Sequence, residues 1–241
     1  DQLAQDQVTY YRPPNAGNRI FAHGKDPYFA AWQDTVQVNY GAPAAHAFMQ
    51  QQLLEVAEVC DAVRCDMAML VLPEVFERTW GQRAPLFWPR ATQRVRERVP
   101  GFTFMAEVYW DMEWTMQQQG FDYTYDKRLL DRLHQPVLEN IKNHLHAELD
   151  FQKASARFLE NHDEQRIASP DFAGSADKGK PAMVVSTTIS TSPTLLYFAQ
   201  ELGEPGAENA GFGSPTRTSI FDYIGVPSLQ RWTNHKKFDG V

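Results

Sequence analysis

The sequence has few cysteines and no long run of apolar residues. Its 241 residues include two cysteines, Cys60 and Cys65. A disulfide framework would need more cysteines and a structural metal site would need more ligands close by, so we interpret both thiols as small buried side chains. Because no stretch of about eighteen apolar residues occurs, the sequence predicts no membrane-spanning helix.

Basic side chains are also fewer than acidic ones. The sequence has 23 Lys and Arg and 30 Asp and Glu, which gives a formal net charge of -7. Nucleic acids and anionic membranes bind clustered basic residues, so neither is an expected partner, whereas a neutral substrate fits. The opening DQLAQDQ has neither the basic nor the apolar region of a signal peptide, yet the chain starts at Asp1 without an initiator Met. The compartment therefore stays open, with the cytoplasm slightly favoured over the periplasm or secretion.

A hydrophobic content of 43%, with 12% aromatic residues, is enough for a sizeable core in a soluble globular protein. Residues 1–42 are rich in Pro, Gly, Asn and aromatics without a sustained helical or strand period, which predicts a long loop excursion. From Pro43 to Cys60 apolar residues recur at helical spacing, and the short strand-like run DAVRCDM follows at 61–67.

Strand and helix continue to alternate along the chain. Further strands are expected at 102–108, 121–125, 157–162 and 194–198, with helices between them at 91–99, 129–149 and 183–189. Strands that alternate with helices predict parallel βαβ units, and hence an α/β barrel or a doubly wound sheet. The segment from Gly203 onward is rich in Gly, Pro, Ser and Asn, which predicts an ordered loop with one short element.

Polar residues follow the first two strands at the end where parallel barrels place their active sites. Period-2 alternation puts Arg64 and Asp66 on one face, where Arg64 would keep the carboxylate ionised, as a nucleophile requires. Glu107 ends an apolar strand beside Tyr109 and Trp110, and burial there would raise its pKa, as a general acid requires. Each carboxylate also has a structural interpretation, an ion pair that fixes strand to strand or a cap at a strand end.

A third polar group follows the strand expected at 157–162. Alternation places Asn161 and Asp163 on one face and Glu160 and His162 on the other unless the strand has ended, and burying so many polar groups is costly without a purpose. A metal site built on His162 is an alternative, but consecutive residues of a strand cannot all face one ion and no second histidine lies at ligand spacing. We therefore expect neither a metal nor a cofactor here.

Three carboxylates at the ends of successive strands suggest glycoside hydrolysis, in which one carboxylate attacks the anomeric carbon and another protonates the leaving oxygen. Neighbouring strands lie about 4.8 Å apart, close to the roughly 5–5.5 Å that separates the two groups in retaining enzymes. The sequence thus predicts Asp66 as nucleophile, Glu107 as acid/base and Asp163 as a third carboxylate that orients substrate hydroxyls.

These segments resemble the α-amylase family (glycoside hydrolase family 13). DAVRCDMAM is similar to its nucleophile strand, FMAEVYWD to its acid/base strand, FLENHDEQRI to the strand with the third catalytic Asp, and LLYFAQELGEPG to the last strand, usually written with Tyr-x-Gly-Gln-Glu. WQDTVQVNYG and IFDYIGVPSLQRW extend the resemblance, the latter to bacterial members acting on maltodextrin-like glucans. Two features depart from the family: Ala62 replaces the usual Gly, and the upstream Asp-x-x-x-Asn-His motif is absent.

The resemblance implies retaining hydrolysis of α-glucosidic bonds in starch-like or maltodextrin-like glucans. Arg64 would then be the ion-pair partner of the nucleophile, and Asn161 and His162 would contact the substrate. Tyr109 and Trp110 would stack on a neighbouring sugar, or else pack at the barrel rim. An α-glucan transglycosylase with the same site and a catalytically inactive carbohydrate-binding barrel remain alternatives, and a structural calcium cannot be predicted from these residues.

The resemblance also implies which part of a barrel is present. Residues 1–42 would be the loop excursion after strand three, and 43–241 the C-terminal part of a TIM-type (β/α)8 barrel, about strands four to eight, with a terminal loop segment. Because such an open sheet exposes its strand edges, we expect the chain alone to be unstable, oligomeric or poorly active.

Overall fold

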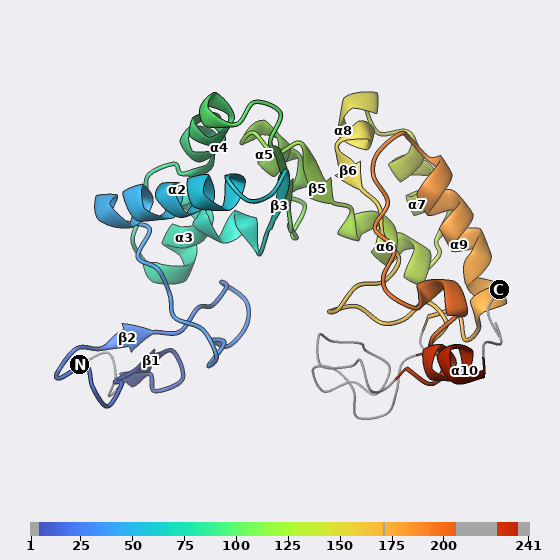
Figure 1. Cartoon of the computed structure of the whole chain (residues 1–241), viewed down its shortest axis with the longest axis horizontal. Coiled ribbons are helices and arrows are strands. Elements are labelled where there is room, and N and C mark those ends of the chain that lie inside the picture. The colour runs from blue at the N-terminus through green and yellow to red at the C-terminus, as the bar shows by residue number, and fades with distance from the viewer. Residues whose placement is uncertain (1–4, 171, 206–225, 236–241) are drawn as a thin grey trace. The chain divides into compact units, whose positions relative to one another are not determined.

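The computed structural model describes residues 5–170, 172–205 and 226–235, and the chain divides into two compact units, Asp1–Asp122 and Tyr123–Val241 (Figure 1). In both units, parallel strands alternate with helices, which confirms the α/β class. The first unit contains, in chain order, β1 (Tyr10–Tyr11), β2 (Phe21–Ala22), α2 (Pro43–Ala57), β3 (Ala62–Cys65), the 3-10 helix η1 (Ala68–Val71), α3 (Pro73–Trp80), α4 (Trp88–Arg98), β4 (Thr103–Ala106) and α5 (Glu113–Gln118).

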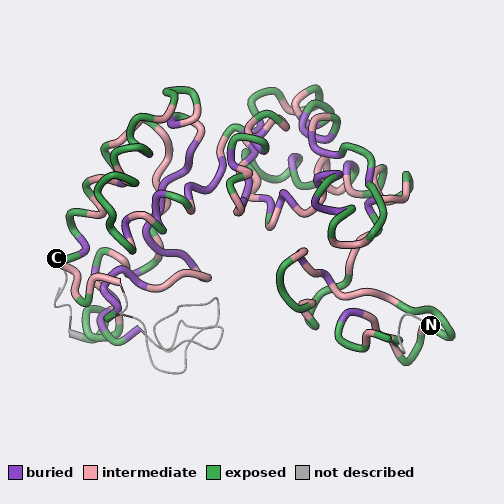
Figure 2. The backbone as a smooth tube through the Cα atoms, turned by 180° about the vertical axis from the view of Figure 1, so that it is seen from behind, coloured by how far each residue is buried: buried purple, intermediate pink, exposed green. Residues whose placement is uncertain are grey.

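The segment before α2 has little regular structure. β1 and β2 form a short antiparallel ladder in which Tyr10 lies opposite Ala22, and Gly24 forms an isolated bridge with Trp32. Most of the residues from 5 to 42 are exposed or half-buried, as Figure 2 shows. Turns and extended chain therefore make up most of this segment.

β3 and β4 are parallel neighbours, with Ala62 opposite Thr103 and Cys65 opposite Ala106. They confirm the central parts of the strands expected at 61–67 and 102–108. Pro43 occupies the first turn of α2, as its fixed φ favours. Both strands are shorter than expected because the chain turns at the polar residues that follow them.

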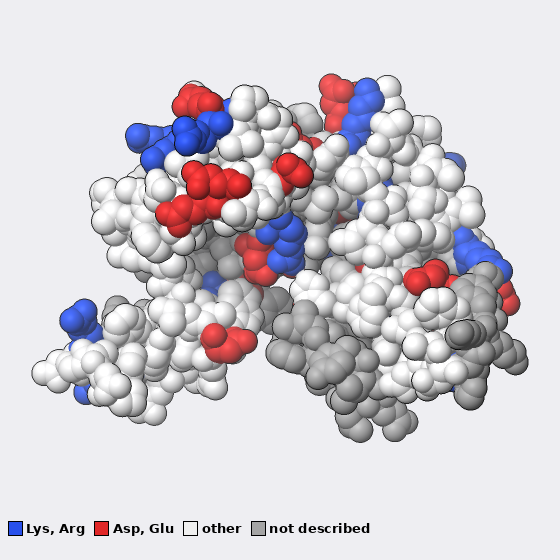
Figure 3. Space-filling model, viewed as in Figure 1, with Lys and Arg blue, Asp and Glu red and all other residues white. Residues whose placement is uncertain are grey.

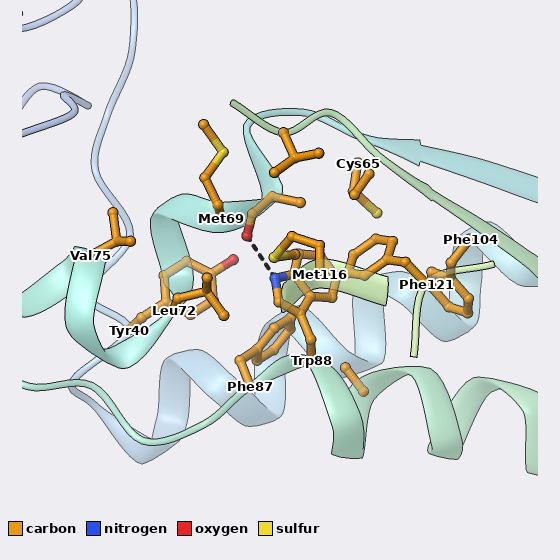
Figure 4. Close-up of a cluster of buried hydrophobic side chains, with 14 of the residues drawn as sticks. Tyr40, Cys65, Met69, Leu72, Val75, Phe87, Trp88, Phe104, Met116 and Phe121 are labelled. Atoms are coloured by element: carbon orange, nitrogen blue, oxygen red, sulfur yellow. Dashed lines mark hydrogen bonds between the residues drawn. The ribbon is translucent and has the colours of Figure 1, made fainter. Parts of the chain in front are cut away.

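A hydrophobic core fills the first unit (Figure 4). Trp88 meets both Phe87 and Phe121 edge to face, with ring centroids 5.0 and 4.8 Å apart. The indole Nε1 of Trp88 donates a hydrogen bond of 2.7 Å to the carbonyl of Ala68, marked by the dashed line in Figure 4. The core therefore fixes the chain directly after β3.

Both cysteines are free, but they differ in exposure. Cys65 is buried as expected, and burial raises the pKa of its thiol to about 12, so it is a neutral side chain near pH 7. The expectation is wrong for Cys60, which is exposed and donates through Sγ to the carbonyl of Val56 at 3.1 Å. Cys60 lies beyond the C-terminal end of α2, in a segment where Val59 is also exposed.

The second unit contains β5 (Tyr123–Tyr125), α6 (Lys127–His134), α7 (Leu138–Leu145), α8 (Leu149–Lys153), β6 (Ser155–Ala156), α9 (Ala176–Thr188), the 3-10 helix η2 (Gln200–Leu202) and α10 (Pro227–His235). β5 and β6 are parallel, with Thr124 opposite Ser155. Pro136 lacks an N–H and lies between α6 and α7, so the single helix expected at 129–149 is three helices. α9 confirms a helix over most of 183–189, and residues 206–225 of the terminal loop lie outside the described residues.

The strand expected at 157–162 is misplaced. Its ladder is at Ser155–Ala156, because Thr124 donates to the carbonyl of Ala154 at 2.8 Å and Asp126 donates to that of Ala156 at 2.9 Å. Serine and alanine have weak strand propensity, so the sequence pattern favoured the apolar residues further along. The strand ends before the polar residues that it was expected to carry.

The strand expected at 194–198 is reduced to one bridge. Thr194 pairs with Arg157, and Leu195 donates to the carbonyl of Arg157 at 2.7 Å. Beyond this point the chain leaves the ladder and turns at Ala199, which has a φ of 62°. This turn is the physical reason that no longer strand forms.

A buried polar cluster joins β5, α7 and the end of β6. The carboxylate of Asp126 pairs with the guanidinium of Arg157, is 2.8 Å from His144 Nε2, and accepts the N–H of Leu129 at 3.0 Å. Asp126, Arg157 and His144 are each at most 3% exposed. Burial and, to a smaller extent, nearby arginines lower the pKa of His144 to about 4, so its ring is neutral near pH 7.

Small groups of acidic and basic side chains lie together on the surface, as on the face in Figure 3. Arg83, for example, pairs with both Glu74 and Glu77 at 2.7 and 2.9 Å. Within the described ranges, no helix has the length and apolar character needed to cross a membrane.

The left-handed residue Ala199 gives a test of backbone strain. The family pattern that this segment resembles has Gly here, and Gly enters this region without a Cβ clash. We expect Ala199→Gly to raise Tm by about 1–3 °C, because relief of roughly 1–2 kcal/mol of strain exceeds the extra chain entropy of roughly 0.5–1 kcal/mol. Thermal unfolding measures the shift. Ala182→Gly, inside α9, is the control and should lower Tm; an equal loss at Ala199 would contradict the prediction.

Candidate active site

Asp66 is the first residue after the paired part of β3. Its Oδ2 accepts from Arg64 Nη1 at 2.6 Å, and its side chain is 76% exposed. The two side chains therefore share a face, as the alternation predicts. A carboxylate that is open to solvent in this way is accessible to a ligand.

Glu107 occupies the corresponding position on β4, because Cys65 and Ala106 are the last paired residues of the two strands. The residue is 3% exposed, and both oxygens are held. Oε1 is 2.9 Å from Arg64 Nη2 and accepts from the hydroxyl of Tyr109 at 2.9 Å, while Oε2 accepts the N–H of Met67 at 2.6 Å. The carboxyl group is therefore fixed in one orientation.

Burial raises the pKa of Glu107, and the charge of Arg64 and the Met67 N–H offset this effect only in part. The direction agrees with the expectation from the sequence. A raised pKa favours the protonated form of the carboxyl group, which suits a group that must donate a proton.

Met67 connects the two strand ends. It has φ 40° and ψ 45°, in the left-handed region that residues other than Gly rarely adopt. The next residue, Ala68, donates its N–H to the carbonyl of Glu107 at 3.0 Å and accepts from Trp88. A strained residue persists only where its surroundings fix it, so the turn after Asp66 is held by both Glu107 and the core.

Tyr109 and Trp110 are each engaged by protein groups. Tyr109 donates to Glu107, and the Trp110 ring meets the Tyr28 ring edge to face at a centroid distance of 4.8 Å. Tyr28 accepts in turn from Arg78 Nη1 at 2.7 Å. These contacts place the segment around Tyr28 against the turn after β4. Stacking of either ring on a sugar stays a prediction.

In the second unit, Asn161, His162 and Asp163 lie in a turn beyond β6. Asn161 is buried, and its Oδ1 accepts the N–H groups of Asp163 and Glu164 at 2.8 and 2.9 Å. His162 Nε2 and Asp163 Oδ2 lie 3.1 Å apart, with side chains 32% and 35% exposed. Because the strand has ended, these two side chains meet and do not alternate between faces.

Glu160 and Arg166 are buried beneath this turn, and both are 0% exposed. Glu160 Oε2 accepts the N–H of Ile167 at 2.9 Å, and its Oε1 is 3.5 Å from Arg166 Nη1. Burial, more than any other effect, raises the pKa of Glu160 to about 7. Neither residue was predicted as part of a site.

Glu160 should make the stability of the fold depend on pH. Its pKa is raised from 4.5 in water to about 7 by burial and by Glu204, against the opposing effects of Arg166 and the Ile167 N–H. The folded state therefore holds a proton that the unfolded state releases, and the stabilisation is complete below about pH 4.5 and lost as the pH rises to about 7.

The measurement is urea unfolding of the parent and of Glu160→Gln between pH 4.5 and pH 8. Relative to Glu160→Gln, the free energy of unfolding of the parent should fall by about 3 kcal/mol from pH 4.5 to pH 8, because the amide cannot ionise. A constant difference between the two proteins across the range would contradict the raised pKa.

Among the residues that the structure describes, no group of three or more His, Cys, Asp and Glu side chains could hold a metal ion. The first unit brings together Arg64, Asp66, Glu107 and Tyr109, whereas the second brings together Asn161, His162 and Asp163. Sequence reasoning missed Met67 because its contribution is a backbone N–H, which leaves no signal in the side-chain pattern.

Comparisons with known proteins extend these observations. No protein-family model and no curated protein matches the sequence. Solved structures do match: a debranching enzyme of Nostoc punctiforme (18% identity, TM-score 0.55, 74% of this chain and 41% of that one), a cyclic alpha-maltosyl-(1-->6)-maltose hydrolase of Arthrobacter globiformis (14%, 0.59, 81% and 43%) and an alpha-amylase of Lactobacillus plantarum (20%, 0.53, 97% and 55%).

The chain thus spans about half the length of the solved structures that it matches. At these identities the likeness concerns the fold. The chain has the fold of part of an α-amylase-type enzyme. This confirms the fold that the motifs predicted, a partial α/β barrel, but not which of its strands are present.

Proposed function

We propose that the chain carries much of the active site of an α-amylase-family enzyme that hydrolyses α-glucosidic bonds with retention. Asp66 is the nucleophile, Glu107 the acid/base and Asp163 the third carboxylate. The central observation is that Arg64 pairs with both an exposed and a buried carboxylate, at corresponding positions of neighbouring strands. Opposite environments suit the opposite tasks of attack and proton donation.

In the first step, an Asp66 oxygen attacks the anomeric carbon while protonated Glu107 gives its proton to the glycosidic oxygen, which leaves as an alcohol. In the second step, ionised Glu107 takes a proton from a water molecule whose oxygen attacks the same carbon and releases Asp66. Arg64 pairs with Asp66 and orients its carboxylate, and Tyr109 and the Met67 N–H hold the carboxyl group of Glu107.

Asp163 and His162 contact the hydroxyls of the glucose ring whose anomeric carbon is attacked. Asn161 holds the turn that carries both residues. In the proposed barrel they follow a later strand than Asp66 and Glu107, and the chain supplies about strands four to eight. The substrate is an α-glucan, and the matched structures support this class: the debranching enzyme was soaked with acarbose, and the second enzyme hydrolyses cyclic alpha-maltosyl-(1-->6)-maltose.

Covalent trapping tests the proposal. The full-length protein is treated with a 2-deoxy-2-fluoro-α-glucosyl fluoride, and the labelled peptide is identified by mass spectrometry. The label is expected on Asp66 and should disappear in Asp66→Asn. The exposed carboxylate of Asp61, at the start of the same segment, provides the matched control Asp61→Asn, which should still be labelled.

Labelling of any other residue would exclude Asp66 as nucleophile. A protein that binds maltooligosaccharides but neither hydrolyses them nor accepts the label would instead be a carbohydrate-binding barrel. Transfer of the glucosyl group to a second sugar, in preference to water, would identify a transglycosylase that shares the first step.

A further inference from the structure

The turn that carries His162 and Asp163 is closed beneath by two buried ionisable residues. Glu160 precedes the turn and Arg166 follows it, and both side chains are 0% exposed. Glu160 reaches across the turn to accept the N–H of Ile167 at 2.9 Å, while Arg166 Nη1 lies 3.5 Å from Glu160 Oε1. The two ends of the turn are therefore joined inside the protein.

Arg166 also attaches this closure to a separate part of the second unit. Its Nη1 donates to the carbonyl of Phe198 at 2.7 Å. The guanidinium carbon lies 4.7 Å from the centre of the Tyr197 ring and 4.8 Å from that of Phe198. Two rings and a carbonyl thus fix the position of the guanidinium. The guanidinium therefore fixes the position at which the loop with His162 and Asp163 ends.

The tip of the turn has its own fixed geometry. Asn161 Oδ1 accepts the N–H groups of Asp163 and Glu164, so the backbone at Asp163 is held from below. At this tip, the side chains of His162 and Asp163 are each about one third exposed. A turn whose lower part is buried and hydrogen-bonded, and whose tip is accessible, can hold a functional side chain in one position.

We propose that Glu160 and Arg166 are positioning residues that hold His162 and Asp163 in the orientation that the substrate requires. The consequence for catalysis rests on the function proposed above, but the closure of the turn does not depend on it. A purely stabilising role is the alternative, since removal of one partner of any buried ion pair destabilises a protein.

Replacement of both charges separates the two roles. In Glu160→Leu/Arg166→Met both members of the buried pair are replaced, and apolar replacement of buried pairs is often neutral for stability. The nearby buried carboxyl group of Glu204 loses the charge of Arg166 but still accepts the N–H of Ser228 at 2.9 Å. The double variant nevertheless loses the bonds to the Ile167 N–H and the Phe198 carbonyl. Glu160→Gln is the conservative variant, because its amide oxygen can still accept from Ile167. Asp177→Asn, at an exposed pair with Lys180, is the surface control.

Backbone amide exchange of Asp163 and Glu164 provides the readout, because both amides bond to Asn161. In the double variant, we expect these amides to exchange at least about tenfold faster, the equivalent of one hydrogen bond, while Tm stays near the parental value. Glu160→Gln at pH 5 and Asp177→Asn should exchange within about twofold of the parent. In the full-length protein, kcat on a maltooligosaccharide should fall about tenfold in the double variant with KM nearly unchanged.

Parental exchange rates at Asp163 and Glu164 in the folded double variant would overturn the proposal. A double variant in which kcat falls only together with Tm would also overturn it, because a stabilising role alone would then account for both residues. A parent protein that hydrolyses no α-glucan would refute the proposed function, but the exchange rates would still decide whether Glu160 and Arg166 hold the turn.

Discussion

Glu107→Gln is expected to lower kcat for an α-linked maltooligosaccharide by about 10²–10⁴-fold, the usual contribution of a general acid. The amide retains the size of the carboxyl group, and its oxygen can still accept the Met67 N–H while its NH2 group donates to the Tyr109 hydroxyl, so the fold should persist. It cannot give a proton to the leaving oxygen. Steady-state kinetics of the full-length protein measure the loss.

The substrate provides the sharpest control for Glu107. An α-glucosyl fluoride has a leaving group that departs without protonation, so the first step with this substrate should be much less impaired in Glu107→Gln. Glu97→Gln, an exposed change on α4, should leave both reactions unchanged. Equal losses on both substrates would show that Glu107 is not the proton donor.

Asp126→Ala should be the most destabilising of the substitutions considered. Its carboxylate pairs with buried Arg157, bonds to neutral His144 and caps the first turn of α6 at Leu129. Without it, the guanidinium of Arg157 is left unpaired in the interior, at a cost of about 3–5 kcal/mol. For a chain of this size, Tm should fall by roughly 6–20 °C.

Urea and thermal unfolding test this expectation. Glu139→Gln is the matched control, because Glu139 pairs with Lys142 three residues away and both side chains are more than half exposed. That change should leave Tm almost unaltered, since exposed pairs contribute little. A similar small shift in Asp126→Ala would mean that Arg157 finds another partner or reaches solvent.

Much of the first unit could be predicted because its pattern is local. The apolar run before Glu107 and the alternation of Arg64 and Asp66 are both visible within a few residues, and the strands and the ion pair follow from them. The short ladder at Ser155–Ala156 could not be predicted, because neither residue favours a strand. Its pairing with β5 comes from tertiary contacts.

The candidate site shows the same division. The raised pKa of Glu107 follows from an acidic residue at the end of an apolar strand, which the sequence displays. The roles of Met67 and Arg166 do not, because one acts through a backbone N–H and the other through a carbonyl 32 residues away in sequence. Contacts of this kind are chosen by the folded chain and carry no residue-type signal.

The hydrogen bond between Trp88 and the carbonyl of Ala68 has a spectroscopic consequence. A buried indole with a single fixed acceptor emits at shorter wavelength than one in water, and its near-ultraviolet circular dichroism depends on that fixed environment. The sequence has six tryptophans, so the signal of Trp88 is the difference between the parent and Trp88→Phe, and this difference reports on the chain immediately after Asp66. Opening of this turn would shift the emission to the red even where helix content and overall compactness stay the same.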